Sequence, residues 1–226
     1  MKSGFLVVFD LDGTLIDSGA DLAAAVKATL FRIAPDAPAL PPDRIRSFVG
    51  HGAGTLVERA LAEAGLPQRA DAVLPLFLEV YRAHMLDTTR LYPGVRETLD
   101  ALGGRNLAVL SNKPGDMCRA ILEGLGVAGA FARIYGPEDV PARKPDPAGL
   151  RRLMEDAGVA PEDTAMVGDS AVDVRTGRAA GVLTVGVSYG LDPEGLRAES
   201  PDLILDDLRD LPRHLGRPRP PVSVLP

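Results

Sequence analysis

The sequence predicts an α/β protein with a doubly wound parallel-sheet core and an α-helical cap domain inserted after the first strand. Short apolar runs without polar alternation recur along the chain, as strands covered on both faces require. Helical patterns separate the later runs, which favours right-handed β-α-β crossovers. The interval from about 17 to 90 contains helical patterns but no convincing strand, so we place the insertion there.

Four segments share the apolar composition of buried strands. They are FLVVF (5–9), LAVL (107–110), TAMV (164–167) and LTVGV (183–187). Between the later strands, Met117, Ile121 and Leu125 recur every four residues, which predicts a helix over 117–125. A second helix is expected over 147–158, where apolar residues recur with helical spacing and a glycine ends the run.

The interval after the first strand contains three helical stretches. The first begins at Ser18 and Asp21, which have the spacing of a capping box, and Leu22, Val26 and Leu30 form its apolar stripe. The other two are GTLVERALAEAG (54–65) and ADAVLPLFLEVYRAHML (70–86). A proline-glycine pair in LYPGV then returns the chain to the sheet. We therefore expect a core domain at 1–16 and 91–215, a helical cap domain at 17–90 and a proline-rich tail at 216–226.

Composition limits the classes of function. With 226 residues, 46% hydrophobic and 25% charged, the chain is typical of a globular protein. The net charge of −6 argues against nucleic-acid binding. The apolar start before Asp10 is too short for a signal peptide or a membrane span, and the single cysteine, Cys118, favours a reducing compartment. We expect a cytoplasmic protein with a small-molecule partner and no nucleic-acid or membrane partner; a homo-oligomer is left open.

Polar clusters follow the apolar segments. They are the Asp10 and Asp12 pair, SNKP (111–114), RKPDP (143–147) and GDSAVD (168–173). In an open parallel sheet, ligands bind beyond the carboxyl ends of the strands, so these clusters are expected to share one crevice. Asp10 and Asp169 would raise each other's pKa there unless a cation lay between them. Oxygen ligands of this kind suit a hard ion such as Mg²⁺, which in turn attracts phosphate.

These strings resemble the four motifs of the haloacid dehalogenase (HAD) superfamily, in the same order. The inserted helices resemble its α-helical cap of the first type, and the core would then be the Rossmann-like HAD sheet. Within the superfamily the chain is most similar to the phosphoglycolate phosphatase group, from about residue 5 to 210. The strings that carry this similarity include DSGADL (17–22), VGHGAGTLVERAL (49–61), LYPGV (91–95) and VGDSAVDVRTGRAAG (167–181).

The resemblance implies a Mg²⁺-dependent phosphomonoester hydrolase. Asp10 would attack phosphorus and form an aspartyl-phosphate, and Asp12 would protonate the leaving alkoxide and later activate water. The metal would be held by Asp10, the backbone carbonyl of Asp12 and Asp169, with Asp173 supporting this ligand set. The third acid of the opening stretch, Asp17, is expected at the hinge into the cap.

The resemblance also assigns residues that bind substrate. Ser111 and Asn112 would bind the transferring phosphoryl group, and Lys144 would stabilise its charge. In the cap, GHGAG (50–54) resembles the substrate-specificity loop of the group. Its backbone amides could meet an anionic group. The cap residues proposed to contact substrate are His51, Gly52 and Arg59.

Several other functions are weighed against this one. A true dehalogenase would lack the acid at Asp12, and a phosphonoacetaldehyde hydrolase needs a cap lysine, for which only Lys27 is present between 17 and 90. A β-phosphoglucomutase-like phosphotransferase is an alternative, but the cap is more similar to that of the phosphatases. A receiver-like phosphate-accepting switch is a non-enzymatic alternative, which the helical insertion and Asp12 disfavour. The first candidate substrate is 2-phosphoglycolate; amino-sugar phosphates, nucleotides and pyrophosphate are alternatives. The string YGPED (135–139) departs from the group, in which Gly-Gly-Asp is frequent.

Overall fold

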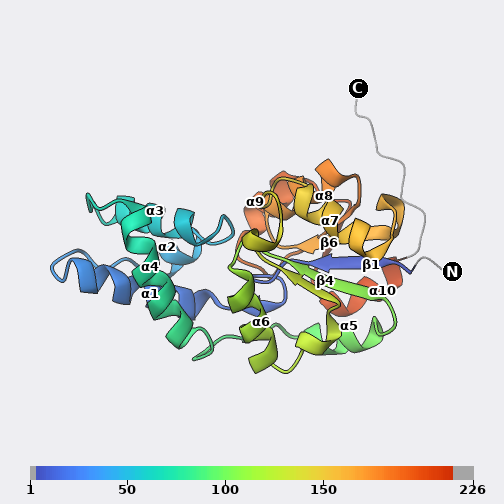
Figure 1. The fold of residues 1–226 in the computed structure, drawn as a ribbon, viewed down its shortest axis with the longest axis horizontal. Helices are drawn as coiled ribbons and strands as arrows, with labels where there is room; N and C mark the ends of the chain where they lie inside the picture. Colours follow the sequence, from blue (N-terminus) through green and yellow to red (C-terminus); the bar gives the residue numbers. More distant parts are fainter. Residues whose placement is uncertain (1–3, 216–226) are drawn as a thin grey trace.

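The computed structural model describes residues 4–215 and shows a sheet flanked by helices beside a separate group of helices (Figure 1). The sheet has six strands in the order β5-β4-β1-β6-β7-β8, and every neighbouring pair is parallel. The strands are β1 (Leu6–Phe9), β4 (Asn106–Leu110), β5 (Arg133–Tyr135), β6 (Thr164–Gly168), β7 (Leu183–Val187) and β8 (Leu203–Leu205). The predicted α/β class and the four predicted strands are confirmed, and the two edge strands, β5 and β8, were not predicted.

Helices cover both faces of the sheet because the strands are apolar on both sides (Figure 1). Val7 and Phe9 belong to one buried cluster, and Leu6 and Val8 belong to the other. The first cluster includes residues of α5 (Val95–Ala101), α6 (Gly115–Gly124) and α10 (Leu211–His214). The second includes residues of α7 (Ala148–Ala157) and α8 (Ala171–Ala180), and α9 (Pro193–Ala198) packs beside α8. Short 3₁₀ turns lie at Ala128–Ala130, Pro137–Asp139, Pro161–Asp163 and Leu208–Asp210.

The strand order creates a switch point at the centre of the sheet. The chain runs from β1 to β4 and β5 on one side and then crosses back to β6, β7 and β8 on the other. The carboxyl ends of β4, β1 and β6 are therefore neighbours, and helices lead away from this point in opposite directions. Such a position leaves a crevice at the strand ends, where ligands bind in doubly wound sheets.

Four helices form a second unit, which we call the helical lobe (19–84). They are α1 (Gly19–Ile33), α2 (Pro42–Arg46), α3 (Ala53–Glu63) and α4 (Ala70–His84). The predicted stripe of α1, made of Leu22, Val26 and Leu30, is buried against α3 and α4. The short helix α2 was not predicted; it begins at Pro42, and proline is favoured in the first turn of a helix. The exact domain boundaries stay a prediction, and the predicted tail at 216–226 lies outside the described residues.

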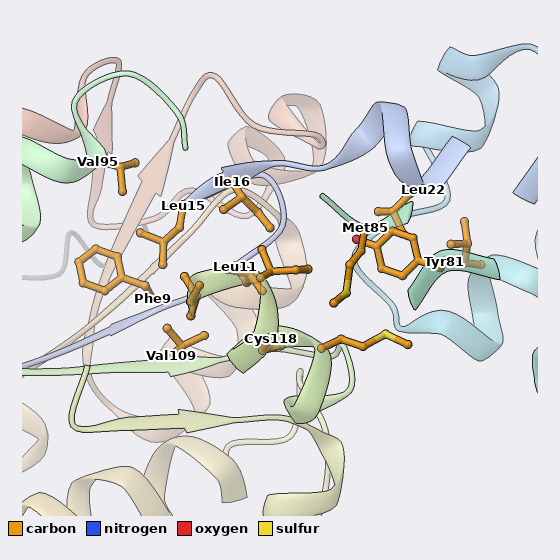
Figure 2. Packing of buried hydrophobic residues seen from close by; sticks show 14 of the residues in the cluster. Phe9, Leu11, Leu15, Ile16, Leu22, Tyr81, Met85, Val95, Val109 and Cys118 are labelled. Carbon is orange, nitrogen blue, oxygen red and sulfur yellow. The ribbon is translucent and has the colours of Figure 1, made fainter. Parts of the chain in front are cut away.

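The apolar core continues from the sheet into the helical lobe. Figure 2 shows Phe9 and Val109 at the sheet, Leu11 beyond them, and Leu22 and Tyr81 in the lobe. All five belong to one buried cluster. The two units thus share apolar contacts next to the carboxyl end of β1, where the candidate site lies.

Two chain segments connect the units. They pair as short antiparallel strands, β2 (Ile16–Asp17) and β3 (Arg90–Leu91). Asp17 lies in β2, and its carboxylate forms ion pairs with Arg46 at 3.6 Å and with Arg90 at 3.3 Å. These contacts join α2 and the returning segment to the point where the chain leaves the sheet.

The capping box expected at the start of α1 is wrong. Ser18 makes no side-chain cap bond, and its hydroxyl donates to the carboxylate of Asp12. The carboxylate of Asp21 instead accepts hydrogen bonds from the backbone N–H groups and the hydroxyls of Thr88 and Thr89. Asp21 therefore fastens α1 to the segment that returns to the sheet.

Replacing Asp21 with alanine is expected to lower the free energy of unfolding by about 3 kcal/mol, because the donors of Thr88 and of the buried Thr89 lose their acceptor. Burial raises the pKa of Asp21, but the hydrogen bonds from Thr88 and Thr89 outweigh burial and lower it. A lowered pKa gives stability that is present above the pKa of the unfolded chain and lost as the pH falls. Urea unfolding at pH 7 and at pH 3 measures both effects.

The exposed Asp36 supplies the control, since an alanine there is expected to change the free energy of unfolding by less than about 0.5 kcal/mol. The difference in the free energy of unfolding between the wild type and Asp21→Ala is expected to be smaller at pH 3 than at pH 7. If this difference in the free energy of unfolding is absent at pH 7, or is equally large at both pH values, the proposed role of Asp21 is contradicted.

Candidate active site

Asp10 stands at the carboxyl end of β1, in the centre of the sheet. Its backbone N–H donates to the carbonyl of Val167 in β6, so the strand pairing continues to this residue. A tight turn follows, in which Gly13 has a φ of 89°, a conformation that glycine adopts without strain. The turn is closed by hydrogen bonds between Gly13 and Ile16 and between Ile16 and Leu11. It places the two acids of the motif on the crevice side of the sheet.

Lys144 connects two of the predicted acids. Its ammonium lies 2.8 Å from Oδ1 of Asp10 and 2.6 Å from Oδ1 of Asp173. The other oxygen of Asp173 accepts hydrogen bonds from the backbone N–H and the hydroxyl of Ser170 at the start of α8. Burial alone would lower the pKa of Lys144, but the carboxylates of Asp10 and Asp173 raise it above its usual value. The ammonium therefore stays charged in the crevice.

A third carboxylate completes a candidate metal site. Oxygen atoms of Asp10, Asp169 and Asp173 lie within 4.8 Å of one another, and all three residues are buried. Burial raises the pKa of Asp169, and the charges of Asp173 and Asp10 raise it further. Burial likewise raises the pKa of Asp10, against the opposing effect of Lys144. Three buried carboxylates with one ammonium leave an excess of negative charge, and a divalent cation with oxygen ligands fits this set.

Two glycines leave space for Asp169. A Cβ atom added to Gly13 or to Gly190 would overlap the Asp169 side chain, well inside van der Waals contact. The backbone N–H of Leu191 donates to Oδ2 of Asp169 at 2.6 Å, and the hydroxyl of Thr14 lies 3.4 Å from its Oδ1. The carboxylate is thus held in one orientation by backbone that approaches it closely.

Replacing Gly190 with alanine is expected to weaken the binding of a divalent cation at the carboxylate cluster by about 10- to 100-fold, because the new methyl group displaces Asp169. Gly190 has no left-handed φ, so the effect is steric. Alanine at Gly129, where a Cβ meets nothing within 4 Å, is the control and is expected to leave the affinity for a divalent cation unchanged, as measured by isothermal titration calorimetry. Equal affinities for the cation in both variants would contradict a role of Asp169 in metal binding.

The segment after β4 reaches two neighbouring loops. Ser111 is buried at the strand end, and its hydroxyl accepts from the backbone N–H of Lys113 at 3.3 Å. The amide of Asn112 donates to the carbonyl of Gly50 in the helical lobe at 3.1 Å and to that of Lys144 at 3.0 Å. Asn112 therefore ties the lobe's glycine-rich loop and the Lys144 loop to the sheet.

Two functional candidates, Lys113 and Tyr81, were not among the predicted site residues. The ammonium of Lys113 lies 2.8 and 2.9 Å from the oxygens of Asp12 and 2.9 Å from the hydroxyl of Tyr81 in α4. Burial alone would lower the pKa of Lys113, but Asp12 and Tyr81 raise it. SNKP contains Lys113, but a lysine after a strand is usually solvated, and nothing in the sequence indicates that α4 supplies its partner.

A cavity lies between the sheet and the helical lobe. It is lined from the core by Asp10, Asp12, Ser111, Asn112, Lys113, Pro114 and Met117, and from the lobe by Leu22, Val49, Gly50, Gly52, Ala53, Leu56, Phe77, Leu78 and Tyr81. Of the three predicted lobe contacts, only Gly52 lines this cavity. His51 is exposed, and Arg59 lines a separate hollow beside Arg44 and Phe48. The geometry therefore does not bring His51 and Arg59 to the cavity with the carboxylates.

The departure YGPED forms a short turn that supports the site. A carboxylate oxygen of Glu138 accepts from the backbone N–H of Gly115, the first residue of α6. Gly136 approaches Gly115 so closely that a Cβ on Gly136 would overlap its backbone. Cys118, in the next turn of α6, is fully buried, and burial raises the pKa of its thiol. The turn thus fixes the start of the helix that follows SNKP.

The chemistry of this site follows from its contents. A buried carboxylate at a strand end faces an ammonium and two further carboxylates, and a second acid, Asp12, lies beside a different ammonium. Such an arrangement suits covalent transfer of an anionic group, with one carboxylate as nucleophile and another as acid and base. Across residues 4–215, every helix is too short or too polar to cross a membrane.

Comparisons with known proteins agree with the fold and the motifs. The model of the family described as haloacid dehalogenase-like hydrolase matches residues 7–187. A phosphoglycolate phosphatase from Pseudomonas putida is 43% identical over 215 residues, which cover 91% of this chain and 78% of the relative. A phosphoglycolate phosphatase from Rhodospirillum rubrum is 40% identical over 223 residues, covering 95% of this chain and 92% of the relative.

A solved structure shares the same architecture. The crystal structure of a predicted phosphoglycolate phosphatase from Haemophilus somnus superimposes with a TM-score of 0.84 and 32% sequence identity. The match covers 94% of this chain and 98% of that one. It therefore includes both the sheet and the helical lobe.

Proposed function

The chain belongs to the haloacid dehalogenase-like hydrolase family. From this premise we propose that it is a Mg²⁺-dependent phosphatase and that 2-phosphoglycolate is the first candidate for its substrate. The curated relatives named above support this substrate. We include in the proposal that the helical lobe is the cap that covers the bound ester. The small phosphate ester would enter the cavity between the lobe and the sheet.

Asp10 is the proposed nucleophile. Its carboxylate attacks phosphorus, the bond to the leaving oxygen breaks, and an aspartyl-phosphate remains on the enzyme. Lys144, at 2.8 Å, neutralises charge on the nucleophile and the phosphoryl group, while Ser111 and Asn112 bind the phosphoryl oxygens. A Mg²⁺ ion held by Asp10, Asp169 and the backbone carbonyl of Asp12, with Asp173 in support, would supply further charge neutralisation.

Asp12 is the proposed acid and base. It gives a proton to the leaving alkoxide and then takes one from the water that hydrolyses the aspartyl-phosphate. The observation that carries the proposal is the separate pairing of the two acids: Asp10 contacts Lys144, whereas Asp12 contacts Lys113 and Ser18. Two carboxylates in two environments can perform two different tasks.

A panel of phosphate esters with Mg²⁺ tests the proposal. Repeated release of phosphate, fastest from 2-phosphoglycolate, is the expected result. Faster turnover of an amino-sugar phosphate, a nucleotide or pyrophosphate would assign another substrate to the same mechanism. Transfer of phosphate between sugar hydroxyls would indicate a β-phosphoglucomutase-like enzyme, and retention of one phosphate per chain would indicate a receiver-like switch.

A further inference from the structure

Lys113 is a buried cation that the proposed phosphoryl chemistry does not use. Its side chain is 5% exposed, and its ammonium contacts only Asp12 and Tyr81 among the interactions described. Of the described residues that line the cavity, it is the only one with a positive charge. Asp10 already has Lys144 as its partner, so Lys113 is not needed to neutralise the nucleophile.

The contacts of Lys113 place it on the leaving-group side of the site. It touches Asp12, which gives its proton to the departing oxygen, and it touches Tyr81, which comes from the helical lobe. In the proposed mechanism the phosphoryl group occupies the other side, where Asp10 and Lys144 meet. A substituent attached to the leaving oxygen therefore extends toward Lys113.

The ammonium can exchange one of its two Asp12 contacts for such a substituent. Lysine has three N–H donors, and the three contacts of Lys113 are the two carboxylate oxygens of Asp12 and the hydroxyl of Tyr81. The ammonium also lies 4.6 Å from the centre of the Tyr81 ring, which fixes its position further. A substrate carboxylate can therefore take the donor that now contacts one Asp12 oxygen, while the contact with the other Asp12 oxygen and the contact with Tyr81 persist.

The surroundings favour a short and charged substituent. The lobe side of the cavity is lined by apolar side chains, among them Leu22, Leu56 and Phe77. A neutral polar group would lose its water there and gain little. A carboxylate would gain a charge-assisted hydrogen bond in an environment that strengthens it.

We propose that Lys113 is a specificity-determining residue that binds the carboxylate of a short phosphorylated hydroxy acid, and that Tyr81 positions its ammonium. This inference rests on the proposed phosphatase function and identifies the residue that recognises its substrate class. Arg143 is a rival cation, because its guanidinium lies close to Gly52, which lines the cavity. Arg143, however, is exposed and lines a different hollow.

The test compares two esters of equal length, 2-phosphoglycolate and 2-hydroxyethyl phosphate, which carry a carboxylate and a neutral hydroxymethyl group. In Lys113→Met, kcat/KM for 2-phosphoglycolate is expected to fall by about 100-fold, mainly through KM, because a binding contact is lost. The value for 2-hydroxyethyl phosphate is expected to fall by about 5-fold or less. Tyr81→Phe is expected to lower the ratio of the two values by about 3- to 10-fold.

Lys27→Met and Arg143→Met are the controls. Both are expected to keep the wild-type ratio of kcat/KM for 2-phosphoglycolate to kcat/KM for 2-hydroxyethyl phosphate. Turnover of p-nitrophenyl phosphate verifies that each variant is folded, and Lys113→Gln replaces Lys113→Met where the latter is not folded. If kcat/KM falls equally for both esters in the Lys113 variant, Lys113 only holds Asp12 in place, and the inference is overturned. So does a selective loss in Arg143→Met, or a wild type without preference for the carboxylated ester.

Failure of the proposed function gives a different result. A wild type that hydrolyses none of the three esters with Mg²⁺ refutes the phosphatase, and the inference falls with it. A wild type that hydrolyses them, together with an unchanged ratio in the Lys113 variant, refutes the inference alone.

Discussion

Replacing Asp10 with asparagine is expected to lower kcat for 2-phosphoglycolate by about 10⁴-fold or more, because the amide cannot form the acyl phosphate. The size of the effect follows from the task, since the uncatalysed hydrolysis of phosphate monoesters is among the slowest reactions known. Asparagine has nearly the same shape and can still accept a hydrogen bond from Lys144, which lies 2.8 Å from Oδ1. The fold is therefore expected to persist.

Acid quenching with a ³²P-labelled ester measures the step directly. The wild type is expected to retain label on the protein during turnover, and Asp10→Asn is expected to retain none. Asp146→Asn is the matched control, because Asp146 lies in the loop of Lys144 but is exposed and outside the carboxylate cluster. If Asp10→Asn turns over the ester with Mg²⁺ at a rate near that of the wild type, Asp10 is not the nucleophile.

The interior of the sheet could be predicted from the sequence, but its edges could not. The four predicted strands are central or next to the edge, covered on both faces, and therefore continuously apolar. The edge strands β5 and β8 have only three residues each, with exposed positions such as Arg133 and Ile204. Short strands with exposed side chains lack the apolar pattern, so the sequence contains little signal for them.

The carboxylate cluster could be predicted because each member belongs to a motif at a strand end. Parallel pairing of β1 with β4 and β6 then brings Asp10 next to Asp169 without further information. The contacts made by the helical lobe could not be predicted. Tyr81 reads as one residue of an apolar stripe, and Asp21 reads as a helix cap, but their partners are 32 and 67 residues away in the chain.

The environment of Asp12 also explains why one strand end can hold two acids with different roles. Its carboxylate contacts Ser18 and Lys113 and is not a member of the carboxylate cluster that includes Asp10. The two acids are two residues apart in the chain, and each meets a different ammonium. A mutation at Asp12 is therefore expected to affect proton transfer without removing the nucleophile.

Replacing Asp12 with asparagine is expected to lower kcat for 2-phosphoglycolate by about 10³-fold, because the leaving alkoxide no longer receives a proton. With p-nitrophenyl phosphate the leaving group needs no proton, so the first step is expected to slow by about 10-fold or less. The second step still lacks its base. A burst of p-nitrophenol, equal in amount to the enzyme, is therefore expected before a slow steady phase.

Stopped-flow absorbance measures this burst, and Asp17→Asn is the matched control from the same stretch. Asp17 contacts Arg46 and Arg90 at the connection to the helical lobe, so its amide variant is expected to turn over both esters within about 3-fold of the wild type. Because the Asp12 backbone carbonyl is retained, the Mg²⁺ requirement of Asp12→Asn should not change. Equal losses for both esters without a burst would contradict the acid-base role and assign Asp12 to positioning alone.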